Sequence, residues 1–155
     1  MNRPNKIEYY LTIAEAVSLR STCLRRQYGA VIVKDDTIVS TGYNGSPRGD
    51  VNCIDTGKCW REANNIPHGE QYEKCRAVHA EMNAVINAAR NGSRVKNGTL
   101  YLGGFVDGAL MADAVEPCLM CKRVLQNAGI RKVVVRDISM PKGYKTFDIQ
   151  ERKKE

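Results

Sequence analysis

The sequence predicts an α/β fold in which helices cover a sheet. Segments with helical spacing of apolar residues alternate along the chain with short apolar runs of the kind that buried strands show. Their order is helix, hairpin, helix, strand, helix, strand, which implies a parallel portion of sheet with the hairpin at one side. With 155 residues, the chain suits one domain that has its own core.

The first part of the chain is expected to form a helix and a hairpin. Apolar residues follow helical spacing over 7–17, and the helix runs out near Ser18–Cys23. The apolar run 29–34 then predicts a strand, and a turn at Asp35–Asp36 leads to its returning partner over 37–43.

The second part of the chain is expected to add further helices and strands, separated by irregular segments. The regular elements are expected over 78–91, 99–102, 118–128 and 132–136. The segment 44–74 shows no convincing periodicity, and its length indicates a loop that is functional or held by a metal. Residues 103–116 are also expected to be irregular, and the tail from Asp137 is expected to hold one more short element.

The composition limits the location and the partners of the protein. No apolar run resembles a signal peptide or reaches membrane-spanning length, so we expect a cytoplasmic protein with no membrane partner. In that reducing compartment, six cysteines favour metal ligands or buried thiols over disulfides. The net charge of +7 favours anionic partners, and a phosphate-bearing small molecule satisfies it as well as a nucleic acid. Part of the excess is the tail 152–154, expected to be a solvated end.

One stretch joins a candidate metal ligand to a candidate proton carrier. His79 and Glu81 stand two residues apart at the expected start of a helix, so their side chains point to different sides of one turn. The imidazole can therefore hold a metal while the carboxylate reaches a ligand of that metal. Further along, Pro117 starts a second helix on which Cys118 and Cys121 stand one turn apart.

These residue types meet the needs of hydrolytic zinc catalysis. One histidine and two cysteines supply three tetrahedral ligands and leave the fourth position to a water, whose pKa the metal lowers. Glu81 is then placed to take the water proton and return it to a leaving group. The pattern His-x-Glu followed by Pro-Cys-x-x-Cys is the signature of zinc nucleobase deaminases. Taken singly, the same residues could be a redox cysteine pair, a core histidine and a first-turn helix acid.

Other segments follow the same family's order, namely 29–33, 42–49, 51–53 and 79–84. Together with the cysteine motif, they make the chain resemble the cytidine and deoxycytidylate deaminase family over about 7–136, and within it the deoxycytidylate (dCMP) deaminases. The resemblance implies a three-layer α/β/α fold with a mixed five-stranded sheet, whose last strand or helix comes from the tail. It implies a single domain over 1–155, with its core at about 7–136 and a charged tail at 137–155.

The resemblance also implies the site and the reaction. The implied ligands of the catalytic zinc are His79, Cys118 and Cys121. Glu81 would carry protons, and Asn44 and Ala80 would contact the substrate. The implied reaction is hydrolytic deamination of dCMP at carbon 4, which gives ammonia and dUMP for thymidylate synthesis. Family members are commonly hexameric homo-oligomers and are often allosteric, with dCTP as activator and dTTP as inhibitor.

A second, structural zinc is known in some members of the family. By that analogy its ligands would be Cys23, Cys53, His68 and Cys75. Cys59 is then left free, although it could replace one member of the set. The alternative is that all of these are free thiols beside a histidine that binds no metal.

Three arginines are candidates for binding a substrate or effector phosphate, because a guanidinium fork suits phosphate oxygens. They are Arg26, Arg48 and Arg90. For any one of them, a solvated surface arginine or a cation at a helix C-terminus is the competing interpretation. The segment 103–114 departs from short family members and is expected to lie beside the zinc, where it would influence substrate choice.

Two rival functions compete with this hypothesis. One keeps the chemistry and changes the substrate to another cytosine nucleoside or nucleotide, or to a base in a nucleic acid. A nucleic-acid substrate is disfavoured because the few aromatic residues are not interleaved with basic ones. The other rival is a zinc-stabilised binding module without turnover, which would need a fourth protein ligand at His79 and would leave Glu81 without a task.

Overall fold

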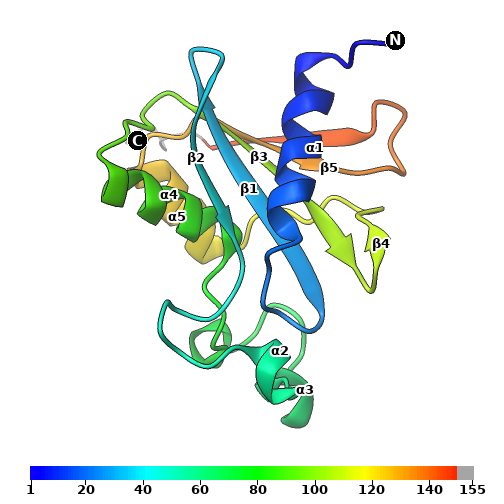
Figure 1. Cartoon of the computed structure of the whole chain (residues 1–155), viewed down its shortest axis with the longest axis vertical. Coiled ribbons are helices and arrows are strands. Elements are labelled where there is room, and N and C mark those ends of the chain that lie inside the picture. The colour runs from blue at the N-terminus through cyan, green and yellow to red at the C-terminus, as the bar shows by residue number, and fades with distance from the viewer. Residues whose placement is uncertain (150–155) are drawn as a thin grey trace, which may run out of the picture.

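The computed structural model describes residues 1–149 and is built on one mixed sheet (Figure 1). The strands are β1 (Arg26–Lys34), β2 (Thr37–Tyr43), β3 (Thr99–Val106), β4 (Ala109–Leu110), β5 (Lys132–Arg136) and β6 (Tyr144–Asp148). The helices are α1 (Lys6–Ser18), α2 (Cys53–Thr56), α3 (Trp60–Ala63), α4 (Ala80–Asn91) and α5 (Leu119–Asn127), with a 3₁₀ turn at Tyr72–Lys74. None of the helices in this part of the chain has the length and apolar character needed to cross a bilayer.

The order of the strands confirms the expected mixed sheet. The main path runs β2-β1-β3-β5-β6, and the two-residue β4 pairs with the end of β3 as a sixth strand. Only β3 and β5 are parallel among the paired strands of residues 1–149, and α5 lies between them in sequence. The remaining pairs are antiparallel, including the predicted hairpin of β1 and β2.

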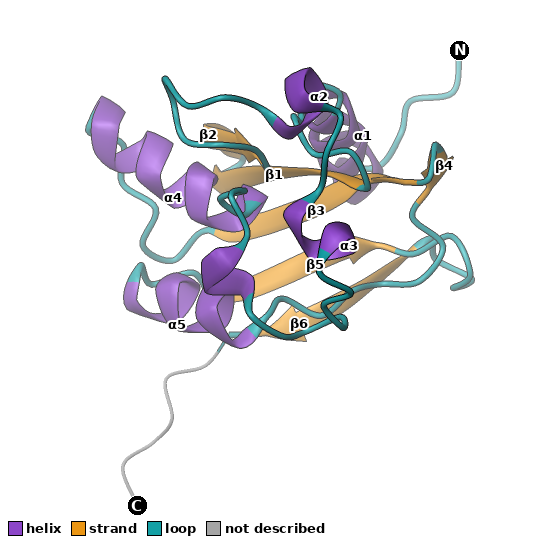
Figure 2. Cartoon of the chain, turned by 90° about the horizontal axis from the view of Figure 1, so that it is seen from below, coloured by secondary structure: helices purple, strands orange, loops and turns teal. Residues whose placement is uncertain are grey.

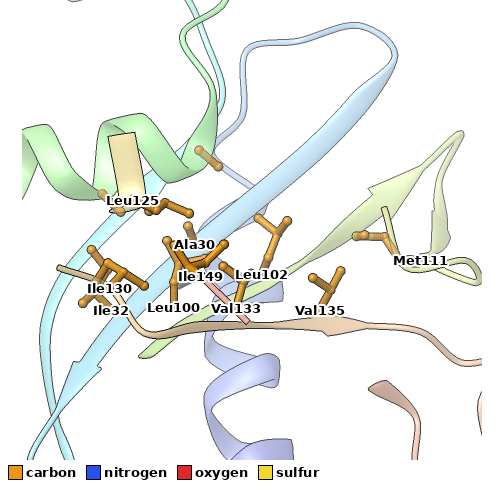
Figure 3. Packing of buried hydrophobic residues seen from close by; sticks show 12 residues of the cluster. Ala30, Ile32, Leu100, Leu102, Met111, Leu125, Ile130, Val133, Val135 and Ile149 are labelled. Atoms are coloured by element: carbon orange, nitrogen blue, oxygen red, sulfur yellow. The ribbon is translucent and has the colours of Figure 1, made fainter. Parts of the chain in front are cut away.

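Helices cover both faces of the sheet, which gives the three layers. Alternate strand residues form two cores, because successive side chains of a strand point to opposite faces. Ala30, Ile32 and Leu100 face α4 and α5, together with Leu125 of α5, as Figure 3 shows. Val31 faces α1 in the other core. The helices α4 and α5 lie side by side on one face, and α1 lies on the opposite face (Figure 2).

The expected helix ends are confirmed in the structure. The helix α4 ends at Gly92, whose φ of 70° is the left-handed conformation typical of a glycine at this position. The helix α5 ends at Ala128, and Gly129 follows with a φ of 79°. The turn residues Asp35 and Asp36 both have positive φ, which matches a two-residue turn between β1 and β2.

The prediction that residues 103–116 are irregular is wrong for the first half of that segment. The strand β3 continues to Val106, and β4 pairs back onto it. The cause is the pair Gly103–Gly104, which lowers strand propensity but permits close packing. A Cβ at Gly104 would lie 1.9 Å from the carbonyl oxygen of Gln27 in β1. The sequence shows the low propensity but not this close contact between strands.

The sheet extends past residue 136, where the resemblance ends. The strand β6 comes from the tail and pairs with β5, and Ile149 reaches the core on the α5 side. The tail was expected to supply a last strand or helix, and the structure shows a strand. The basic residues 152–154, predicted to be a solvated end, lie outside the described residues.

Candidate active site

The candidate zinc ligands come together where α4 and α5 begin. His79 is the residue that caps α4, and Cys118 is the residue that caps α5, so both helix N-termini point at the same place. The Nδ1 atom of His79 lies 3.5 Å from Cys118 Sγ and 3.4 Å from Cys121 Sγ. The parallel crossover through α5 places its first turn beside that of α4 (Figure 2).

The geometry of these three groups fits zinc. Their ligand atoms lie within 4.8 Å of one another, and no other group of this kind occurs in residues 1–149. A tetrahedral zinc with ordinary bond lengths separates its sulfur and nitrogen ligands by about 3.6 Å, close to the distances found here. Nitrogen and thiolate donors are those that zinc prefers, and the positive ends of two helices favour the thiolate form.

The electrostatics of the two cysteines differ before any metal binds. A hydrogen bond from the Cys121 thiol, with a smaller contribution from His79, lowers the pKa of Cys118 to about 4, although burial opposes the shift. The same hydrogen bond, together with burial, raises the pKa of Cys121. The site therefore begins with one ready thiolate, and metal binding would release the second proton.

Glu81 is buried next to these ligands in the first turn of α4. Only 6% of its surface is exposed. Burial raises the pKa of its carboxyl, while the neighbouring His79 partly opposes that shift. A carboxyl group whose pKa is raised in such a site is suited to carrying a proton between reacting groups.

A cavity of about 830 Å³ opens onto the site. His79, Glu81 and Cys118 form part of its wall, and Tyr28 and Tyr72 contribute aromatic surface. Most of the opposite wall comes from the loop between β2 and α4, which carries α2 and α3 and extends from one end of the sheet (Figure 1). The cavity is large enough for a nucleotide-sized ligand.

Asn44 lines this cavity, but most of its side chain is already bonded. Its Oδ1 accepts hydrogen bonds from the Ser21 hydroxyl at 2.6 Å and from the backbone N–H of Tyr28 at 2.8 Å. Its Nδ2 donates to the carbonyl oxygen of Arg26 at 2.8 Å. One N–H of the amide is left for a ligand. Ala80 is fully buried in the core and does not line the cavity, so only its backbone could contact a substrate.

The residues expected to hold a second zinc line the same cavity, Cys53, His68 and Cys75 from the loop between β2 and α4 and Cys23 from the segment between α1 and β1. Burial raises the pKa of Cys53, and the nearby thiols of Cys23, Cys59 and Cys75 add to the shift. His68 is largely exposed. The partial burial of its ring and the charges of nearby arginines lower its pKa. The structure thus gathers three thiols around that of Cys53, including Cys59, which the family analogy left free. None of these four belongs to a group with the close spacing found at His79 in residues 1–149.

The three candidate arginines differ in their position relative to the cavity. Arg26 lines the cavity. Arg48 lies outside the lining and donates to Oδ1 of Asn87 on α4 at 2.7 Å. Arg90 is exposed in the last turn of α4, also outside the cavity lining.

Three residues that line the cavity could not be recognised from the sequence. They are Tyr28, Arg61 and Tyr72. Tyr28 lies just before the strand expected over 29–34, but the structure begins β1 at Arg26. Arg61 and Tyr72 lie in the segment without periodicity, where burial cannot be read from a pattern.

The comparisons with known proteins agree with this site. The model of the cytidine and deoxycytidylate deaminase zinc-binding region matches residues 4–137. A deoxycytidylate deaminase of Mycobacterium phage D29 is 36% identical over 138 residues, which cover 86% of this chain and 96% of the relative. A deoxycytidylate deaminase of Schizosaccharomyces pombe is 35% identical over 132 residues, and this chain spans 37% of the length of that relative.

Solved structures show the same fold. The dCMP deaminase of cyanophage S-TIM5 matches with a TM-score of 0.62 and 27% identity, over 88% of this chain and 86% of that one. The structure of that enzyme in complex with dCMP and dUMP matches equally well in TM-score, at 0.62 with 26% identity. The matched zinc-binding region and the near-complete phage relative lead to one conclusion. This chain belongs to the cytidine and deoxycytidylate deaminase family, and its site is built for zinc.

Proposed function

We propose that this protein hydrolyses dCMP to dUMP and ammonia, which supplies dUMP for thymidylate synthesis. The observation that carries the proposal is the buried carboxyl of Glu81 beside His79, Cys118 and Cys121 at the wall of a nucleotide-sized cavity. The relatives named deoxycytidylate deaminase, and the similar phage enzyme solved with dCMP and dUMP, support this substrate over other cytosine compounds.

The proposed chemistry uses the chain's residues in distinct roles. His79, Cys118 and Cys121 would hold the metal, and a zinc bound there would supply a Lewis acid that lowers the pKa of a water molecule. Glu81 would accept a proton from the attacking water and deliver it to the ring nitrogen N3 of the base, and would then carry the proton of the new hydroxyl group on carbon 4 to the amino group. The bond from carbon 4 to nitrogen breaks, ammonia leaves, and a carbonyl remains at carbon 4. The buried setting of Glu81 excludes bulk water from this transfer.

We assign the substrate phosphate to Arg26, because other arginines near the cavity already bond to protein groups. Arg25 is paired with Glu62 at 2.9 Å, and Arg76 donates to the carbonyl oxygen of Val51. The hydrogen bond of the Arg26 side chain within residues 1–149 is a long one, 3.5 Å, to the hydroxyl of Tyr28. Its guanidinium therefore has donors to offer to phosphate oxygens. Arg48 and Arg90 lie outside the cavity lining and are proposed only as contacts for an effector.

A structural zinc near Cys53 is a separate part of the proposal. Its supporting observation is the set of four neighbouring thiols, three of which lie in the loop between β2 and α4, where no regular element is longer than four residues. The fourth ligand beside Cys23, Cys53 and Cys75 is either Cys59 or His68. Zinc content per chain should fall from two to one in only one of the variants Cys59→Ser and His68→Ala. One zinc per wild-type chain would refute this second site.

We also propose that the protein is cytoplasmic, forms homo-oligomers and responds to dCTP and dTTP. The support for these properties is the family relationship together with exposed apolar side chains such as Ile86 on α4. Light scattering would test assembly, and dCMP saturation curves with each nucleotide would test regulation.

Ammonia release tests the proposed reaction directly. The panel is dCMP, CMP, deoxycytidine, cytidine and a cytosine-containing single-stranded oligonucleotide, each with the wild-type protein and Glu81→Ala. Turnover of dCMP alone, lost in the variant with zinc still bound, is expected. Activity on another member would keep the chemistry and reassign the substrate. No activity on any member, with zinc bound and dCTP present, would favour the binding-module alternative.

A further inference from the structure

Arg61 is a buried cation that has no ionic partner among residues 1–149. It lies on α3 with 7% of its surface exposed, and none of the ion pairs within residues 1–149 includes it. Burying a charge without a carboxylate partner is costly, so its hydrogen bonds must compensate. The guanidinium donates to the carbonyl oxygen of Pro67 at 2.7 Å and also to that of Glu70. The loop after α3 is thus wrapped around this one side chain.

The same guanidinium holds an aromatic ring. The Cζ atom of Arg61 lies 4.7 Å from the ring centroid of Tyr72, a cation–π geometry. The Tyr72 hydroxyl accepts a hydrogen bond from the backbone N–H of Gly69 at 3.1 Å. Gln71, just before Tyr72, has a φ of 48°, which is strained for a residue other than glycine. The ring of Tyr72 is therefore fixed from two sides.

The fixed ring contacts the metal ligand. The centroids of the Tyr72 and His79 rings are 5.2 Å apart, and the planes meet at 76°, an edge-to-face contact. The Nδ1 atom of this imidazole is the one that faces the two thiols. A metal-binding histidine usually has its ring orientation set by a hydrogen bond from its other nitrogen. Here the described residues supply an aromatic contact that restricts the ring.

We infer that Arg61 and Tyr72 are positioning residues that hold the His79 imidazole ready for the metal. Arg61 acts through Tyr72, and Tyr72 acts by contact with the ring. The inference rests on the proposed function only in that His79 is taken as a zinc ligand. It explains why a positive charge is buried in a loop whose other residues are mostly exposed or half-buried and which lacks long helices. The guanidinium of Arg61 is then not available for the substrate phosphate.

Metal affinity is the decisive measurement. Tyr72→Leu removes the ring, Tyr72→Phe keeps it, and Arg61→Met removes the cation. We expect Tyr72→Leu and Arg61→Met to weaken zinc binding at the His79 site by roughly 10–100-fold, the usual cost of losing a group that orients a ligand. Tyr72→Phe should change it by less than about 3-fold, because the edge-to-face contact remains. Arg76→Met is the matched control on the same loop and should bind zinc like the wild type.

Chelator competition would give the affinity, and the visible spectrum of the cobalt-substituted protein would report the ligand geometry at the site. The site is identified as the one that His79→Ala abolishes. If Arg61→Met does not fold, as judged by circular dichroism, the pair Tyr72→Leu and Tyr72→Phe decides the matter. Wild-type affinity and an unchanged cobalt spectrum in Tyr72→Leu would overturn the inference and leave the proposed site intact. Zinc binding that survives His79→Ala would instead overturn the proposed site, and the inference with it.

Discussion

Asn44 illustrates how a residue can be placed correctly from the sequence and still do a different task in the structure. Its position at the cavity wall is as expected. Most of its amide, however, bonds to Ser21, Arg26 and Tyr28, so it joins the end of β2 to the start of β1. This contact fixes the backbone next to Arg26, the proposed phosphate ligand. Asn44 can therefore affect substrate binding through the backbone as well as through its one remaining N–H.

The variant Asn44→Asp tests this bonded role. The carboxylate cannot donate to the carbonyl oxygen of Arg26, and two acceptors would face each other in a buried place, so we expect a loss of about 2 kcal/mol in the free energy of unfolding. Urea denaturation measures it. The control is Asn83→Asp, whose amide donates to the carbonyl oxygen of Tyr43 in an exposed setting and should cost less than about 0.5 kcal/mol. Equal losses in both variants would contradict the bonded role.

Glu81 is the residue on which turnover should depend most. In Glu81→Gln the amide keeps the size of the side chain but cannot accept the proton, so kcat for dCMP should fall by about 10²–10⁴-fold. Zinc content should be unchanged, because the carboxyl is not one of the three grouped ligands. Steady-state kinetics and metal analysis of the same preparation would check both results. A variant that retains more than a tenth of wild-type kcat would show that another group moves the proton.

At the scale of elements, the site depends on how closely α4 packs on β2. Gly42 in β2 allows this contact, because a Cβ there would lie 2.3 Å from the backbone nitrogen of Ala84 and 2.6 Å from the carbonyl oxygen of Ala80. Ser40 of the same strand donates its hydroxyl to the carbonyl oxygen of Ala84 at 2.6 Å. The position of α4 fixes His79 at its start, so a strand residue outside the cavity lining controls a ligand.

Gly42→Ala should therefore damage both stability and the site. The added methyl has to push the backbone of α4 away, and we expect a loss of about 3 kcal/mol in the free energy of unfolding. Zinc affinity should fall as well, because His79 moves with the helix. Thermal melts and zinc titration would measure the two effects, with the exposed Thr37→Ala in the same strand as control. A stable variant with unchanged zinc affinity would show that α4 can shift without affecting the site.

The helix α1 is held to the opposite face of the sheet by a charged cluster. Arg136 at the end of β5 has a 5% exposed side chain and donates to Glu8 at 2.7 Å and to Glu15 at 2.5 Å. The hydrogen bond from Arg136 is the main cause of the lowered pKa of Glu8. Because the folded pKa lies below the ordinary value of 4.5, the unfolded chain binds more protons between the two values. Stability from this pair is complete above pH 4.5 and is lost as the pH falls through the folded pKa.

The pH profile of stability should show this contribution. The difference in free energy of unfolding between the wild type and Glu8→Gln should be constant from pH 7 down to about pH 5 and should shrink below the ordinary Glu pKa of 4.5. Because the comparison uses the same metal content in both proteins, proton-driven metal loss cancels. Denaturant titrations at a series of pH values supply the data. A difference that grows toward low pH would contradict the sign of the shift.

At the scale of the whole molecule, the metal would link two segments that are far apart in the sequence. His79 begins α4 and the two cysteines begin α5. Zinc would therefore cross-link the two helices that share one face of the sheet. A ligand that binds only the folded chain stabilises it in proportion to its affinity and concentration. The sheet core itself is apolar and does not depend on the metal.

Removal of the metal should lower the melting temperature without abolishing the fold. At a zinc concentration 1,000 times its Kd, binding contributes about 4 kcal/mol, which corresponds to roughly 8–16 °C for a chain of this size. Calorimetry of protein treated with a chelator, with and without zinc restored, would measure the shift. His79→Ala should show a smaller shift than the wild type. Equal shifts in both would place the stabilising metal elsewhere, for instance near Cys53.

The sequence by itself determined the order of elements and the identity of the metal site. Helical spacing and short apolar runs reflect which faces are buried, so the helices and most strand positions could be predicted locally. The motif around His79 and the motif at Cys118 are each continuous in sequence, and each lies at a helix start. They identify the ligands without knowledge of how the two helices meet.

Only the tertiary structure decided which residues the loop between β2 and α4 contributes to the site. It also decided where close packing between strands outweighs a low strand propensity. The extension of β3 through Gly103–Gly104 depends on a neighbouring strand, which local propensity cannot register. The burial of Arg61 and its contact with Tyr72 depend on a loop folding back on itself, without any period to reveal it. Interactions between residues distant in sequence or in irregular backbone leave no pattern in the chain. For that reason the metal ligands were predictable, whereas the residues that hold them in place were not.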